Sequence, residues 1–146
     1  MSLQIEEREK EGIVILDLKG SLMLGDGDLA LRERLAAIHR SGKINIILNL
    51  KEVADIDSTG LGTLVFGLAK LRKAGGRLAL LNVNRKHLKL FLLTRLALAF
   101  EFFVDEQDAV NSFFPDRELK HFDVLEFVQH QEDPNSKDDT RREPAC

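Results

Sequence analysis

The sequence predicts a single α/β domain built on a mixed, mostly parallel β-sheet with helices packed on it. Two short β-prone runs flank Glu11-Gly12, which predicts a hairpin near the N-terminus. Residues 44–50 and 78–83 are apolar on both faces, as is typical of strands that are covered on both sides. Stretches with apolar residues at helical spacing separate the later strands, which favours crossover connections and parallel pairing. The predicted order is β-β-α-β-α-β-α-β-α.

Turn residues divide the first part of the chain. Residues 3–8 and 13–19 are the predicted hairpin strands, and residues 20–27 are a predicted loop. Asp28 is the predicted N-cap of the first helix, because an aspartate side chain can accept from the free N–H groups of a first turn. The residues that define this helix are Leu31, Leu35 and Ile38, at helical spacing, and Ser41-Gly42, which ends it.

Strands and helices alternate in the second part. Residues 44–50 are the clearest strand, and residues 51–57 are expected to form a loop after it. Residues 58–73 have a helical pattern that Ala74-Gly75-Gly76 stops. The remaining predicted elements are a strand at 78–83, a helix at 84–96, a strand at 100–104 and a helix at 105–114.

A helical wheel divides the helix at residues 58–73 into two sides. The residues expected to face the core are Leu61, Leu64, Val65, Leu68 and Leu71. Phe66 falls on the side away from them, together with Thr63 and Lys70. We therefore predict that Phe66 contacts a partner protein. The alternative is that a neighbouring helix or the C-terminal extension covers it.

The composition argues against several classes of function. There are 21 Lys and Arg against 24 Asp and Glu, so the chain lacks the basic footprint of a direct nucleic-acid binder. Cys146 is the single cysteine, which excludes an intrachain disulfide and fits a reducing compartment. The histidines, which show no metal-ligand spacing, are His39, His87, His121 and His130. No cofactor or metal ion is therefore expected.

No targeting or membrane segment is expected either. The N-terminus lacks the apolar region of a signal peptide. The most apolar stretch, residues 88–104, is interrupted by Lys89, Arg95 and Glu101, whereas a membrane span needs about 20 nearly uncharged residues. The sequence therefore predicts a cytoplasmic protein.

The segment Asp55-Ile56-Asp57-Ser58-Thr59-Gly60-Leu61-Gly62-Thr63-Leu64 joins a predicted strand to a helix. Ser58 falls at or next to the N-cap, where free N–H groups and the positive end of the helix dipole meet. Ser58 could serve only as a cap. However, Gly60 and Gly62 each cost the helix about 1 kcal/mol relative to alanine, and a cap does not require them. They leave room for another molecule to approach.

The segment Asp57-Ser58-Thr59-Gly60-Leu61-Gly62 resembles the phosphorylation motif of the STAS-domain anti-sigma factor antagonists. The resemblance covers roughly residues 3–114. It includes Asn45-Ile46-Ile47-Leu48-Asn49-Leu50 before the motif and Ala74-Gly75-Gly76-Arg77-Leu78-Ala79-Leu80 after it. Arg95 stands where members of that family often carry a glycine. The resemblance implies a STAS domain over residues 1–114, followed by an extension at 115–146.

The resemblance also implies a function. Ser58 would accept a phosphate from an anti-sigma factor with serine kinase activity. The unphosphorylated chain would bind that kinase and free the sigma factor, and a serine phosphatase would reset the switch. Phosphate on Ser58 would lie beside Asp55 and Asp57 and create a repulsive surface. The predicted motif and partner-binding residues are Asp55, Asp57, Thr59, Gly60, Leu61, Gly62, Thr63 and Phe66.

Other functions fit the residues less well. A STAS module of a different assembly, such as a sensory scaffold or a transporter regulator, remains the main alternative. A receiver domain needs an acidic pair after its first strand, where this chain has Leu18-Lys19-Gly20. Asp55 and Asp57 lack an accompanying base, so no enzyme is predicted. Gly25-Asp26-Gly27-Asp28 is interpreted as a turn with a cap rather than a metal or phosphate loop.

The C-terminal extension differs from the rest of the chain. Residues 131–146 are polar and contain Pro134 and Pro144, so they are predicted to be disordered. The apolar residues of Phe122–Val128 fit neither the helical nor the strand period cleanly, and the structure of this segment is left open.

Overall fold

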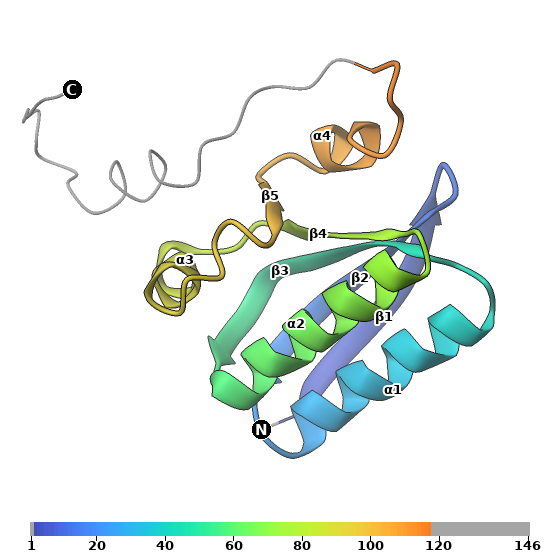
Figure 1. Cartoon of the computed structure of the whole chain (residues 1–146). Helices are drawn as coiled ribbons and strands as arrows, with labels where there is room; N and C mark the ends of the chain where they lie inside the picture. Colours follow the sequence, from blue (N-terminus) through green and yellow to red (C-terminus); the bar gives the residue numbers. More distant parts are fainter. Residues whose placement is uncertain (1, 118–146) are drawn as a thin grey trace, which may run out of the picture.

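In the described part of the chain, five strands form one sheet in the order in which they occur in the sequence (Figure 1). A computed structural model describes residues 2–117. The strands are β1 (Leu3–Lys10), β2 (Ile13–Leu22), β3 (Asn45–Ile56), β4 (Arg77–Leu81) and β5 (Glu101–Phe103). Strand β1 is antiparallel to β2, and every later pair is parallel. The predicted mixed sheet and element order are confirmed.

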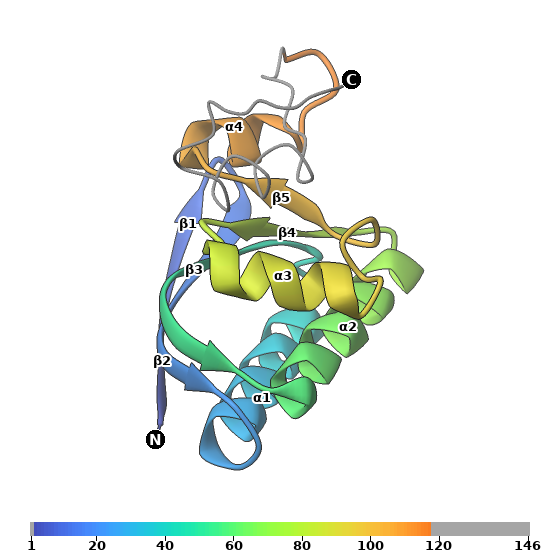
Figure 2. The ribbon, with the colours of Figure 1, turned by 90° about the vertical axis from the view of Figure 1, so that its left-hand side faces the viewer.

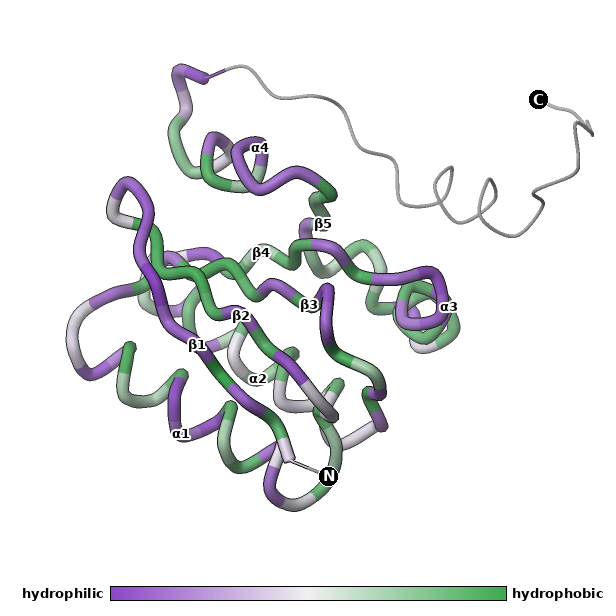
Figure 3. Tube along the Cα trace, turned by 180° about the vertical axis from the view of Figure 1, so that it is seen from behind, coloured by the Kyte–Doolittle hydropathy of each residue, from purple (hydrophilic) through white to green (hydrophobic). Residues whose placement is uncertain are grey.

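Helices cover both faces of the sheet (Figure 2). They are α1 (Asp26–Arg40), α2 (Ser58–Lys73), α3 (Arg85–Leu93) and α4 (Glu106–Asn111). The first three pack on one face, where Leu31, Leu64 and Phe91 belong to the same core as Leu48 of β3. Helix α4 packs on the other face against the apolar residues Ile13, Ile15, Ile47, Ala79 and Leu81. Hydrophobic residues run through the central strands, whereas the turns are mostly hydrophilic (Figure 3).

Strands β2 and β3 are longer than predicted, so the expected loops at 20–27 and 51–57 are wrong over much of their length. The end of β2 pairs with the end of β3 from Lys19↔Glu52 to Leu22↔Ile56. Register shifts interrupt this pairing between Asp17 and Lys19 and between Gly20 and Ser21. The irregular register and the exposed polar residues of β3 break the apolar alternation that identifies a strand.

The first helix also begins earlier than predicted. It starts at Asp26 after Gly25, and no side chain caps it. Asp28 is therefore not the N-cap but a buried residue of the first turn. Helices α3 and α4 begin as expected after side-chain caps from Asn84 and Asp105, but they end at Leu93 and Asn111, earlier than predicted.

Arg95 lies just after α3 and has a φ of 63°, in the left-handed region. This conformation favours glycine, which agrees with the glycine often found at this position in the family that the motif resembles. The turn is formed here with an arginine.

Within residues 2–117, no helix is long and apolar enough to span a membrane. The same residues contain no group of three side chains that could hold a metal ion. The predictions for 122–128 and 131–146 concern residues outside the described part of the chain.

Candidate functional site

Ser58 is the first residue of α2, and one residue, Asp57, separates it from the carboxyl end of β3. Its side chain is exposed. The N-cap is the preceding residue, Asp57. The serine hydroxyl is therefore presented beside a helix N-terminus, at the positive end of the helix dipole, without being needed as the cap.

Asp57 binds two separate segments of backbone. Its Oδ1 accepts a hydrogen bond from the Gly60 N–H at 2.8 Å, and its Oδ2 accepts one from the Leu24 N–H at 3.0 Å. These two hydrogen bonds hold the pKa of Asp57 below its usual value, and the bond from Leu24 has the larger effect. The ionised carboxylate thus fixes the loop before α1 against the start of α2.

The two glycines of the motif have different surroundings. Gly60 is buried, and a Cβ on it would collide with the backbone carbonyl of Leu22 at the end of β2. A Cβ on Gly62 would point into open space, with none of the described neighbouring atoms within 4 Å. Leu61, between them, belongs to the core. Gly60 therefore allows the first turn of α2 to lie against β2, whereas Gly62 keeps an exposed position without a side chain.

Thr63 is buried, whereas the helical wheel predicted that it lies on the side of α2 away from the core. Its hydroxyl donates to Asp28 of α1 and also lies 3.2 Å from the carbonyl oxygen of Thr59. The carboxylate of Asp28 also accepts from Arg32 Nε at 3.0 Å. A wheel of α2 alone does not show that α1 covers this side of the helix. Thr63 is therefore inaccessible to a partner, and its predicted partner-binding role is wrong.

The remaining motif residues lie around Ser58. Asp55, near the end of β3, is exposed, and Lys86 Nζ of α3 lies 3.4 Å from its Oδ1. Thr59 is half-buried. The structure therefore places Asp55, Asp57 and Ser58 at one end of the sheet, where β3 meets α2, with a lysine beside the first of the two carboxylates.

The sequence model of the STAS domain matches residues 4–109. The chain belongs to the STAS domain family. An anti-sigma F factor antagonist of Paenibacillus polymyxa is 33% identical to this STAS domain over 84 residues, which are 58% of this chain and 72% of that protein.

Solved structures share the fold of this STAS domain. An anti-sigma factor antagonist from Mycobacterium paratuberculosis superposes with a TM-score of 0.66 at 20% identity, covering 76% of this chain and 93% of that chain. The phosphorylated form of SpoIIAA, a Bacillus cell fate determinant, gives a TM-score of 0.61 at 23% identity, covering 77% and 99% of the two chains.

The surface of this STAS domain near Ser58 carries exposed apolar side chains. Leu24, whose N–H binds Asp57, is 75% exposed. The other exposed apolar side chains of this surface are Met23, Leu29 and Phe66, with exposed fractions of 37%, 55% and 50%. The exposure of Phe66 agrees with the wheel. The other three were missed, although apolar residues in a predicted loop and at its edge are a signal that could have identified them.

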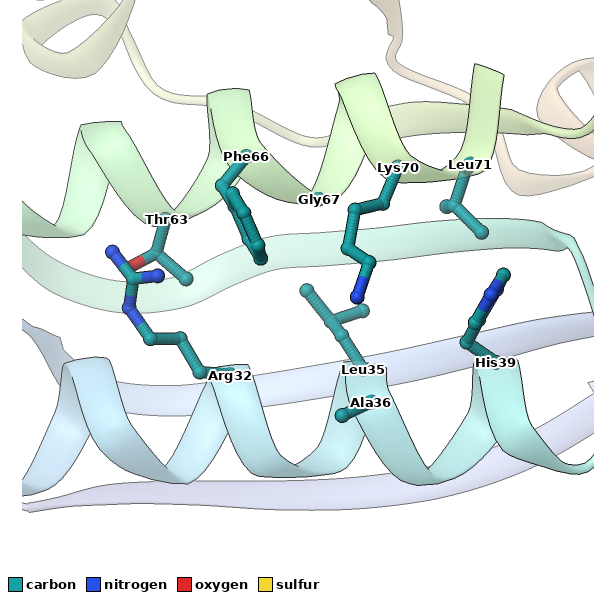
Figure 4. Close-up of a pocket in the computed structure, with 9 residues that line it drawn as sticks. All are labelled: Arg32, Leu35, Ala36, His39, Thr63, Phe66, Gly67, Lys70 and Leu71. Atoms are coloured by element: carbon teal, nitrogen blue, oxygen red, sulfur yellow. The ribbon is translucent and has the colours of Figure 1, made fainter. Parts of the chain in front are cut away.

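Phe66 lines a groove between α1 and α2, and its ring points into the space between the two helices (Figure 4). The Arg32 guanidinium of α1 lies 5.3 Å from the centre of the ring, and the Lys70 ammonium lies 5.5 Å from it. The aromatic side chain therefore lies between two cations. The sequence could not show this arrangement, because Arg32 comes from a different helix.

Proposed function

We propose that this STAS domain is a phosphorylation-controlled protein-binding switch with no catalytic activity of its own. The unphosphorylated form binds an anti-sigma factor with serine kinase activity and so frees the sigma factor. Phosphate on Ser58 abolishes this binding, and a serine phosphatase restores it. The observation that carries the proposal is an exposed serine at a helix N-terminus, next to a surface with exposed apolar side chains.

The exposed apolar side chains support the binding part of the proposal. Leu24 and Phe66 lie on the segments that adjoin Ser58, and both are at least half exposed. Exposed apolar surface of this kind, surrounded by polar residues, is typical of protein interaction sites. A partner that covers it would gain binding energy from a few large side chains and would also cover the serine hydroxyl.

Electrostatics support the switching part. A phosphate on Ser58 adds about two negative charges at pH 7. The positive end of the α2 helix dipole favours these charges, so the fold of the domain is preserved. However, Asp57 is ionised and adjacent, and the apolar surface would have to bury the phosphate in the complex. Binding is therefore lost because of repulsion and desolvation at the interface.

The relatives support the choice of partner. The Paenibacillus polymyxa protein is described as an antagonist of an anti-sigma factor, and SpoIIAA is known in a phosphorylated form. Both properties fit the position of Ser58 in this chain, where a kinase can reach the hydroxyl.

The first test uses the cognate anti-sigma factor, found by affinity capture and identified by mass spectrometry. Incubation with this protein and ATP should place one phosphate on Ser58. The Ser58→Ala variant should stay folded, resist phosphorylation and bind constitutively. The Ser58→Asp variant should bind more weakly, although one carboxylate imitates a dianionic phosphate poorly.

Thr59→Ala is the matched control, because it removes the neighbouring hydroxyl and leaves Ser58 in place. It should be phosphorylated as the wild type is. Phosphate on Thr59 with Ser58 unmodified would contradict the assignment of the acceptor. Capture of a transporter or a sensory scaffold in place of an anti-sigma factor would contradict the proposed pathway.

A further inference from the structure

The charges of this chain are distributed unevenly along the sequence. Residues 58–100 contain eight lysines and arginines and no aspartate or glutamate, whereas the whole chain has 21 basic and 24 acidic residues. The proposed switch uses the motif at the start of this stretch, but it gives no role to the cations of α3. A local excess of positive charge in an acidic protein indicates a site for an anionic partner.

The structure gathers half of these cations on α3 and the loop after it, which face the viewer in Figure 2. The buried side of α3 is formed by His87, Leu88 and Phe91. The opposite side of the helix and much of the loop are exposed. From residue 84 to residue 100 the exposed charged and apolar residues, which together form the α3 surface, are Arg85, Lys86, Lys89, Leu93, Arg95 and Leu98.

Two leucines give the α3 surface its apolar part. Leu93 and Leu98 are 82% and 91% exposed, more than any other large hydrophobic residue among residues 2–117. On a helical wheel, Leu93 falls within about 40° of both Lys86 and Lys89. The apolar and the basic side chains therefore share one stripe of the helix, and Arg95 and Leu98 add one of each kind in the loop directly after it.

The carboxylates that adjoin the α3 surface do not cancel its charge. Asp55 lies 3.4 Å from Lys86 Nζ, and Glu101 at the start of β5 pairs with Arg77. Helix α2 contributes further cations, because Arg72 donates to the carbonyl of Ala99 in the loop at 2.8 Å and is followed by Lys73, which is exposed. Cations therefore outnumber carboxylates in this part of the surface.

Leucines that project from a basic surface complement the headgroup region of an anionic membrane. Lipid phosphates attract lysine and arginine, and apolar side chains beside them can enter the boundary between headgroups and acyl chains. A protein partner would need a separate pocket for each leucine. A nucleic acid offers phosphates to the cations but no apolar layer to the leucines. The α3 surface therefore fits a lipid surface better than either macromolecule.

We propose that the α3 surface binds the surface of a membrane that contains anionic phospholipids. Leu93 and Leu98 insert among the lipid headgroups, and the four basic residues of the α3 surface contact the phosphates. The contact is with the membrane surface alone, since no helix within residues 2–117 is long and apolar enough to span a bilayer. Binding therefore concentrates the domain at a membrane without using Ser58.

Flotation of the full chain with vesicles tests the proposal, with phosphatidylglycerol and phosphatidylcholine in equal parts as the probe. The wild type should float with these vesicles at low ionic strength, stay in solution with pure phosphatidylcholine, and bind less as sodium chloride is added. The double variant Leu93→Ser and Leu98→Ser should lose most of the binding and stay folded, because both leucines are exposed. Arg95→Glu should weaken binding about thirtyfold, because the reversal changes two charges.

Two matched controls make the same kinds of change elsewhere. Leu24→Ser removes an exposed leucine before α1, and Lys51→Glu on β3 alters the net charge as Arg95→Glu does. Both should bind vesicles as the wild type does, and melting curves should show that every variant is folded. Equal binding to the two kinds of vesicle, or binding to neither, would overturn the proposal.

A loss of binding in Arg95→Glu with none in the leucine variant would also overturn it, because the α3 surface would then bind any polyanion without apolar contact. The measurement requires neither an anti-sigma factor nor a phosphate on Ser58. Failure of the proposed function would therefore leave the vesicle result unchanged, and failure of vesicle binding would leave the proposed function unchanged.

Discussion

Asp57 joins two segments that are far apart in the sequence. Its carboxylate accepts from Gly60 in its own helix and from Leu24, which lies 33 residues away. The sequence predicted the N-cap at or next to Ser58, and the structure shows that the cap is Asp57. The bond to Leu24 could not be predicted, because it depends on the tertiary path of the loop before α1.

Replacing Asp57 should therefore affect both the helix and the loop. Asp57→Ala removes the cap and should lower the free energy of unfolding by about 1–2 kcal/mol. Asp57→Asn keeps an acceptor oxygen and should cost less. Urea denaturation at pH 7 measures both variants, and equal losses would show that the charge matters and the cap geometry does not.

The pH dependence separates the charge from the geometry. The pKa of Asp57 is lowered in the folded protein, so the ionised form contributes stability above the unfolded pKa of about 3.9. This contribution is lost as the pH falls through the folded pKa. The stability difference between the wild type and Asp57→Asn should therefore shrink below pH 4, and a constant difference would contradict the assignment.

At the scale of the element, two of the three glycines of α2 have opposite roles. Gly60→Ala should destabilise the domain, because the new Cβ would force Leu22 and the end of β2 to move. Gly62→Ala faces open space and should raise the free energy of unfolding by up to about 1 kcal/mol, the difference in helix propensity. Thermal melting of the two variants gives the comparison.

The Gly60→Ala and Gly62→Ala variants also test which surface of the domain binds the partner. Gly62→Ala should bind the anti-sigma factor more weakly although it is more stable, since the added methyl group occupies the exposed surface near Ser58. A binding constant equal to that of the wild type would place the interface elsewhere on the domain. Similar melting temperatures for the two variants would contradict the packing role of Gly60.

The elements were predicted well where the pattern depended on one segment alone. The bounds of α2 follow from its apolar stripe and from Gly75-Gly76, and they are confirmed. The ends of β2 and β3 were missed, because a strand with irregular register shows no clean alternation. The accessibility of Thr63 was wrong for a different reason. It depends on α1, and no wheel of a single helix contains that information.

At the scale of the whole molecule, the order of the elements predicted a covered parallel sheet but not the distribution of helices. Among the helices of residues 2–117, α4 packs on one face and the other three share the opposite face. This distribution depends on how each connection crosses the sheet, which composition does not specify. The Asp57–Ser58 motif could still be located, because a strand–helix junction lies at the same end of the sheet wherever the helix packs.

Burial of His87 should make the stability of the domain depend on pH. The side chain lies in the first turn of α3 and is 2% exposed. Burial, assisted by the nearby charge of Lys86, lowers the pKa of His87. The unfolded chain takes up a proton near pH 6.5 and the folded chain only at lower pH. The free energy of unfolding therefore falls as the pH decreases from about 6.5.

The His87→Leu variant should lose most of this dependence. For the wild type, the slope contributed by His87 is at most about 1.4 kcal/mol per pH unit, in the pH range where the unfolded histidine is protonated and the folded one is not. Chemical denaturation at half-unit intervals from pH 8.5 to 5 measures both proteins. Above pH 7.5 the two profiles should run parallel, and parallel profiles at lower pH as well would show that His87 does not cause the dependence.

The irregular pairing of β2 with β3 limits how the gene for this domain can vary. The Leu22 carbonyl accepts from the Asp57 N–H at 3.3 Å and also faces Gly60. Its direction depends on the number of residues between Asp17 and Leu22, because one residue more or less exchanges the two faces of a strand. Amino-acid exchanges in this stretch are therefore tolerated more readily than insertions or deletions. In an alignment of functional relatives, gaps should gather in the turns at Gly12 and Gly42 and be absent here.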